Sequence, residues 1–229
     1  MADPDPIESE LATVRDLDVD TIADAIQTIG FQCTHCGGCC TGNPTDPHTA
    51  TVFPDEARDL IAATEGEWNE VVRPMPFGLD ENGTGRTLEW ALETDACGDC
   101  AFYDPDRPGE GGCTVYADRP LLCQTYPFRL AVEAGPTPLG DEVDRAGPVV
   151  AHECEGLGAS IDREEALSLA ETLKRRSIRE LEEMRGVRSV ADRVGPRRAP
   201  TEVIDSEGRK RPDGTAIEVG DPESDHRDV

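Results

Sequence analysis

Nine cysteines restrict what this 229-residue chain can fold into more than any other feature. The first four stand in the run Cys33-Thr34-His35-Cys36-Gly37-Gly38-Cys39-Cys40. Cysteines three positions apart can direct their sulfurs at one metal ion when the backbone between them turns tightly, and Gly37 and Gly38 permit the positive φ that such turns often need. The run therefore predicts a loop that presents thiolates to a metal ion.

The remaining cysteines follow downstream, at Cys97, Cys100, Cys113, Cys123 and Cys154. With Cys154 set aside, eight thiolates suit two four-sulfur sites, or a cluster and a zinc site. Neighbouring side chains in extended backbone point to opposite sides, so Cys39 and Cys40 are not expected to serve one tetrahedral ion. We expect two adjacent sites that share this segment. The division of ligands between them stays open, as does the role of Cys154.

All-thiolate donors favour soft metals, which here means zinc or iron, including an iron–sulfur cluster. Thr41 follows the adjacent cysteines, so the run lacks the later cysteine and proline of bacterial ferredoxins. The predicted metal ligands are Cys33, Cys36, Cys39, Cys40, Cys97, Cys100, Cys113, Cys123 and Cys154.

An odd number of cysteines without a secretion signal indicates metal or redox chemistry rather than a disulfide framework. The N-terminal residues 1–5 are acidic and lack the basic and apolar regions of a signal peptide. No segment approaches the ~18 apolar residues that span a bilayer. We therefore expect a cytoplasmic protein that does not enter a membrane.

The net charge is −26, from 48 acidic and 22 basic side chains. Such a surface repels itself at low ionic strength and is tolerated where salt screens it, which favours a salt-rich, halophilic cytoplasm. Nucleic acid is not an expected partner, because phosphate binding requires a basic stripe. Arg175, Arg176 and Arg179 are close in sequence, but glutamates surround them.

Composition divides the chain into three parts. Residues 1–17 are predicted to be a flexible acidic leader, residues 18–186 a cysteine-cluster metal-binding domain, and residues 187–229 a disordered acidic tail without apolar periodicity. Only 37% of the residues are hydrophobic and 4% aromatic. We expect a small core that bound metal helps to hold together.

Apolar periodicity predicts an α+β fold, with about three helices and a few short antiparallel strands around a small, loop-rich centre linked by metal. Asp162 and Glu165 resemble a capping box at the start of the last helix. The helices are expected over residues 22–29, 54–71 and 162–186, and the strands over residues 88–92, 128–132 and 149–151.

Four other side chains are candidates for roles beside the thiolates. His35, His48 and His152 offer nitrogen ligands, but a histidine inside a C-x-x-C turn tends to point away, and lone loop or strand histidines more often pack or face solvent. Arg119 can donate hydrogen bonds to a thiolate or to an exposed carbonyl, and we favour a structural role.

These motifs together resemble the YkgJ family of cysteine-cluster domains, described as a zinc- or iron-chelating module. The resemblance extends from Phe31 to Gly156 and implies metal binding at the eight main cysteines, without deciding between zinc and iron. Glu155 stands where the family usually has proline, and the role of Cys154 stays open. The motifs are Phe31-Gln32-Cys33, Cys36, Cys39-Cys40, Cys97, Cys100, Cys113-Thr114-Val115-Tyr116, Arg119-Pro120, Cys123, Tyr126-Pro127-Phe128 and Cys154-Glu155-Gly156.

Two functions remain open. One is a metal-stabilised module whose partners are metal ions and a protein that the sequence does not identify. The other is an iron–sulfur-dependent enzyme, redox or methyl-transferring from S-adenosylmethionine, because the family is similar to flagellin lysine methylases. Against the second, no glycine-rich loop follows a strand in a form fit to hold the nucleotide. The sequence does not decide whether the chain is an enzyme.

Overall fold

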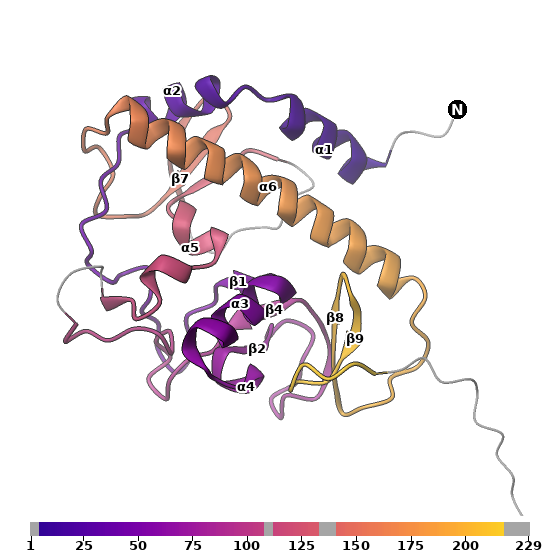
Figure 1. Cartoon of the computed structure of the whole chain (residues 1–229). Coiled ribbons are helices and arrows are strands. Elements are labelled where there is room, and N and C mark those ends of the chain that lie inside the picture. Colours follow the sequence, from indigo (N-terminus) through magenta and orange to yellow (C-terminus); the bar gives the residue numbers. More distant parts are fainter. Residues whose placement is uncertain (1–4, 108–111, 133–140, 218–229) are drawn as a thin grey trace, which may run out of the picture.

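One long helix, α6 (Arg163–Ala191), crosses the computed structural model and packs against elements from both ends of the described chain (Figure 1). The described residues are 5–107, 112–132 and 141–217. α6 begins as the sequence predicts, because Oδ1 of Asp162 accepts a hydrogen bond from the amide of Glu165 at 2.9 Å. This cap satisfies one of the unpaired amides of the first turn.

The C-terminal end of α6 differs from the prediction. The helix does not end near Gly186 but continues to Ala191, because Val187 and Val190 extend its buried face. A β-carbon at Gly186 would lie 2.4 Å from Cβ of Ser206. The glycine therefore permits a close approach of the chain rather than ending the helix.

Two helices precede the cysteine loop, α1 (Pro6–Asp16) and α2 (Val19–Ile29), and both pack against α6. The helix predicted over residues 22–29 is confirmed as part of α2. A flexible leader over residues 1–17 is wrong for the part that the structure describes, because α1 has a buried apolar face at helical spacing. The buried side chains of α1 are Ile7, Leu11 and Val14.

The helix predicted over residues 54–71 is two helices, α3 (Pro54–Thr64) and α4 (Trp68–Val71). Glu65 adopts the left-handed conformation at φ 54°, which ends α3. These helices pack near a three-stranded antiparallel sheet in which the central strand pairs with both others. Its strands are β1 (Thr51–Val52), β4 (Trp90–Leu92) and β2 (Val72–Pro74), in that order.

The strand predicted over residues 88–92 is broken at Glu89, which has φ 66°. Its first residue belongs to β3 (Gly85–Leu88), which pairs in parallel with β8 (Thr201–Asp205) in a different sheet. β9 (Gly208–Lys210) completes that sheet. A disordered tail from residue 187 is thus wrong up to residue 217, because β8 buries residues from Val203 to Asp205 fully. Residues 218–229 lie outside the described part.

The third sheet has the order β5-β7-β6 and is antiparallel. Two of its strands, β5 (Phe128–Leu130) and β7 (Val149–His152), are confirmed near the predicted positions. β6 (Glu142–Ala146) was not expected, because its residues are mostly exposed. A short 3-10 helix (Tyr116–Asp118) and α5 (Leu121–Thr125) lead into β5.

The predicted α+β class is confirmed, with six α-helices in the described residues where the sequence indicated about three. The apolar side chains form two main clusters. The first joins α1, α2, α6 and the β5-β7-β6 sheet and contains no cysteine. The second joins α3, α4 and the β1-β4-β2 sheet, and four cysteines pack in it. Within the described segments, no helix has the length and apolar character of a membrane span.

Candidate metal centre

The loop that carries the first four cysteines turns tightly between α2 and β1. The amide of Cys40 donates to the carbonyl oxygen of Gly37 at 2.8 Å, and Gly37 has φ 76°. A β-carbon at Gly37 would lie 2.5 Å from Oη of Tyr103, so glycine is required there by both conformation and space. The turn separates one half-buried thiol, Cys40, from three exposed ones, Cys33, Cys36 and Cys39.

Four thiols from distant segments meet in the second apolar cluster. The amide of Cys100 donates to the carbonyl oxygen of Cys40 at 2.8 Å, and Cys113 pairs with Tyr103 through an isolated antiparallel bridge. Cys123 lies on α5. Burial and mutual electrostatic interaction join these thiols. We call them the inner group, which consists of Cys40, Cys100, Cys113 and Cys123.

A second set of thiols gathers where the first loop meets the segment after β7. The amide of Gln32 donates to the carbonyl oxygen of Gly156 at 2.9 Å, and Phe31 bridges to Leu157. This pairing brings Cys154 into electrostatic interaction with the other three thiols of the set. We call them the outer group, which consists of Cys33, Cys36, Cys39 and Cys154.

The two groups adjoin at neighbouring cysteines. Sγ of Cys39 and Sγ of Cys40 lie 3.9 Å apart. The hydrogen bond with Cys40 lowers the pKa of Cys39 to about 7, opposed by burial and helped by the guanidinium of Arg119. The same hydrogen bond, together with burial, raises the pKa of Cys40 well above its usual range. Cys39 is therefore the thiol that ionises first at this junction.

Burial is the main influence on the pKa values of the other inner thiols. It raises the pKa of Cys100 to about 11, and it also raises the pKa of Cys113 and of Cys123. Thiols in such surroundings stay protonated unless a cation compensates the charge. A bound divalent metal supplies that compensation, so metal binding at the inner group must be coupled to the release of protons.

Arg119 is a basic side chain whose charge acts on several of these thiols. Its guanidinium stacks 3.6 Å from the ring centroid of Tyr116, and its Nε donates to the carbonyl oxygen of that residue at 3.0 Å. Its charge favours the thiolates of Cys39, Cys113 and Cys123. The structural role favoured from the sequence and the electrostatic role thus occur together.

Cys97 and Cys100 differ in burial, and the predicted ligand role of Cys97 stays a prediction. Cys97 is exposed on a turn, where its amide donates to Oδ1 of Asp95 at 2.8 Å. The C-x-x-C spacing of Cys97 and Cys100 therefore serves a turn here, with only the second cysteine directed inward. Cys154, whose role the sequence left open, takes the fourth place in the outer group.

The histidines differ in their relation to the thiols. Burial lowers the pKa of His48, whose imidazole interacts with the backbone of Cys39, so His48 supports the cysteine loop. His35 is exposed at φ 57°, with its ring 5.8 Å from that of Tyr116. His152 is buried in β7. The support from His48 was missed, because a lone loop histidine carries no sequence signal for it.

Tyr126 also lies beside the outer group. Its hydroxyl donates to the carbonyl oxygen of Glu153, next to Cys154. Burial and the charges of Cys154 and Cys39 raise the pKa of Tyr126 to about 12. This hydrogen bond holds the segment that carries Cys154, a contact that only the folded chain reveals.

The thiols gather without a finished coordination shell. No three His, Cys, Asp or Glu side chains of the described segments are arranged to hold a metal ion. The donor chemistry still fits zinc or iron, because each group supplies four thiols. Thiolate sites commonly close when the metal ion displaces the thiol protons into solvent, so binding and local folding occur together.

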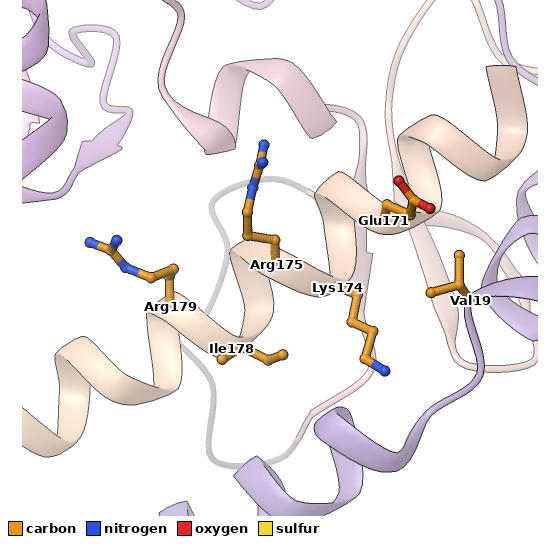
Figure 2. A pocket seen from close by; sticks show the side chains of 6 residues that line it. All are labelled: Val19, Glu171, Lys174, Arg175, Ile178 and Arg179. Atoms are coloured by element: carbon orange, nitrogen blue, oxygen red, sulfur yellow. The ribbon is translucent and has the colours of Figure 1, made fainter.

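Two cavities differ in their relation to these groups. A shallow groove of about 850 Å³ opens beside the outer group, lined by Cys33, Arg119, Tyr116 and the first turns of α6. A smaller cavity of about 300 Å³ lies on α6, where Lys174 and Arg175 leave the helix on opposite sides (Figure 2). Within the described residues, no cysteine lines the smaller cavity. Of these two cavities, only the groove lies beside a thiol.

Comparison with known families identifies the segment that carries the cysteines. The family model CxxCxxCC, "Putative zinc- or iron-chelating domain", matches residues 32–155, more than half of the chain. No curated protein and no solved structure gives a significant match. The matched range begins beside Cys33 and includes Cys154, so it spans both thiol groups. The chain belongs to the CxxCxxCC family of zinc- or iron-chelating domains.

Proposed function

We propose that this protein binds zinc or iron in two adjacent thiolate sites, formed by the inner and outer groups. The observation that carries the proposal is the meeting of Cys40 and Cys100 through a backbone hydrogen bond of 2.8 Å, inside an apolar cluster that also contains Cys113 and Cys123. Four thiols that meet in one apolar cluster supply the sulfur donors that a soft cation such as zinc or iron prefers.

The ligand set proposed here has eight thiols. It includes Cys154 and leaves out Cys97, which the sequence had placed among the ligands. The electrostatic interaction of Cys154 with Cys33, Cys36 and Cys39 supports the first choice. The second choice is supported because the other eight thiols already supply two sets of four without Cys97. In this proposal the metal cross-links segments that lie far apart along the chain.

The metal content of protein purified without oxygen tests this proposal. Zinc sites would give a colourless protein with about two zinc ions per chain. Iron–sulfur clusters would give a brown protein with acid-labile sulfide and a reducible visible band, which would favour the redox or methyl-transferring alternative. A metal-free chain that is folded as described here would contradict metal binding.

We also propose that the protein works in a reducing, salt-rich cytoplasm. All nine cysteines are free, and exposed thiols such as Cys33 and Cys36 remain reduced only in such a compartment. The charge of −26 supports the salt-rich setting, because screening weakens the repulsion between carboxylates.

A further inference from the structure

We propose that the outer group is an exchange site, from which zinc passes to competing ligands while the inner group retains its ion. This inference rests on the proposed metal binding and assigns different roles to the two sites. In this proposal the protein takes up or gives up a zinc ion at the outer group, while a second zinc ion at the inner group maintains the fold.

The two groups differ in burial. Cys100 is 6% exposed and Cys113 is 9% exposed, Cys40 and Cys123 are half-buried, and all four pack in the apolar cluster with Trp90 and Leu92. In the outer group, three of the four thiols are exposed and the fourth is half-buried. A competing ligand must reach the ion before the protein's thiolates release it, so exposed ligands exchange faster than buried ones.

The backbone around the groups differs in the same sense. Inner-group residues belong to paired or packed segments, since Cys100 bonds to Cys40 and Cys123 lies on α5, which packs against α6. Releasing an inner ion requires these segments to separate. Cys33, Cys36 and Cys39 lie on a loop joined to the Cys154 segment mainly through Gln32 and Phe31. Phe31 and Leu157 pack against the first apolar cluster, whereas the four outer thiols themselves belong to neither cluster.

The groove of about 850 Å³ provides the approach to this face. Cys33 lines it, and the guanidinium of Arg119 forms part of the same wall. A small anionic ligand is attracted by that guanidinium toward the thiolates. Asp162, Glu164 and Glu165 line the groove as well, and their charge favours a free cation over a large anion. Access through the groove therefore suits a zinc ion or a small chelator.

Zinc release from the full chain tests the inference. Protein loaded with about two zinc ions is mixed with the chelating dye 4-(2-pyridylazo)resorcinol, and the zinc–dye complex is followed by absorbance. We expect two phases of about one ion each, with rate constants that differ by about tenfold or more, equivalent to about 1.4 kcal/mol in activation free energy. Cys33→Ser should abolish the fast phase and leave the slow one.

Two controls make this result specific. Cys97→Ser removes an exposed cysteine of the same loop-rich region and should leave both phases unchanged. Cys113→Ser should remove the slowly released ion. The natural chain is also treated with N-ethylmaleimide after the fast phase, and the labelled cysteines are identified by mass spectrometry. Cys33, Cys36 and Cys39 should be labelled before Cys100. This measurement does not depend on the folding of any variant.

The outcomes separate this inference from the proposed function. Release of both ions in a single phase, loss of an ion in Cys97→Ser, or modification of Cys100 before Cys33 overturns the exchange site while metal binding stands. A chain that binds no zinc or iron overturns the proposed function, and the exchange site falls with it.

Discussion

Adjacent cysteines with different surroundings organise the centre. Cys39 faces solvent and belongs to the outer group, whereas Cys40 is half-buried and packs with the inner group. Their sulfurs are 3.9 Å apart, so charge on one affects the other. Arg119 lies near enough to favour thiolates of both groups, so we expect this side chain outside the ligand set to affect metal affinity.

We predict that Arg119→Gln weakens zinc binding by about tenfold or more, because the thiolates lose a compensating positive charge. Affinity is measured by competition with a chelator of known strength. Arg119→Lys should restore part of the loss by returning the charge without the stacking on Tyr116. Arg175→Gln, in the cavity on α6 without cysteines, should leave the affinity unchanged. Equal affinities in Arg119→Gln and the natural chain would refute the electrostatic role.

Glu89 is a second residue with an unusual environment. Burial, with the charges of Glu183 and Glu180, raises its pKa from an ordinary 4.5 to about 7. A raised carboxyl pKa means that the folded state disfavours the charged form, so its ionisation destabilises the fold as pH rises from about 4.5 to 7.

We therefore predict that Glu89→Gln stabilises the protein at pH 8 by an amount of order 2 kcal/mol and has little effect at pH 4. Urea unfolding of both proteins at equal metal load gives the difference. Glu81→Gln, at an exposed position, is the control. A gain in stability that is the same at both pH values would show that ionisation of Glu89 is not its source.

Among the helices and strands, the contact between α6 and the β8–β9 hairpin is the least expected from sequence. The hairpin turn carries Ser206, whose amide donates to Oε1 of Glu183 at 2.8 Å. Next to it, Nε1 of Trp90 donates to Oδ2 of Asp205 at 2.9 Å. The hairpin thus links α6 to the strand that leads toward the inner thiols, and Gly186 provides the space for it.

Gly186→Ala tests this contact. Alanine in an exposed helix interior stabilises by about 1 kcal/mol relative to glycine. Here the new β-carbon would meet Cβ of Ser206 at 2.4 Å, so we predict a destabilisation of about 1–3 kcal/mol. Thermal unfolding measures the change. The double variant Gly186→Ala/Ser206→Gly should recover most of the loss. If Gly186→Ala stabilised the protein instead, the β8–β9 hairpin could not lie this close to α6.

The whole molecule consists of two parts. One is helical and its apolar cluster contains no cysteine, and the other contains the inner group. Both tryptophans, Trp68 and Trp90, pack in the second cluster. The helices α1, α2 and α6 have their own apolar cluster. Loss of metal should therefore affect the two parts unequally, although they share α6.

We predict that chelation shifts tryptophan fluorescence to longer wavelength, because the second cluster loosens when the inner thiols lose their ion. Far-ultraviolet circular dichroism should keep most of its helical signal, since the first cluster contains no cysteine. Re-addition of zinc should reverse the fluorescence change. Unchanged fluorescence after complete chelation would contradict a metal-stabilised second cluster.

The overall charge leads to a prediction of its own. At −26, the folded chain repels itself, and raising the salt from about 0.1 M to 1 M shortens the Debye length from ~10 Å to ~3 Å. We expect the urea midpoint of the metal-loaded protein to rise over this range of KCl. A midpoint that falls or stays constant would argue against adaptation to salt.

Sequence alone determined the residue types of the metal centre and much of the secondary structure. The spacing of cysteines around Gly37 identified a thiolate loop, and apolar periodicity placed α2, the start of α6, β5 and β7, because these features depend on neighbours along the chain. Amphipathic α1 escaped notice because polar residues outnumber its three buried ones.

Tertiary structure alone decided which cysteines meet. The spacing favoured Cys97, which stands in a C-x-x-C pair, over the isolated Cys154, whereas the grouping of the thiols depends on the backbone pairing of Cys40 with Cys100 and of Gln32 with Gly156. The same holds for β8, whose burial comes from parallel pairing with β3, far away along the chain. Local patterns specify turns and helices, but contacts between distant segments arise from the packing of the whole chain.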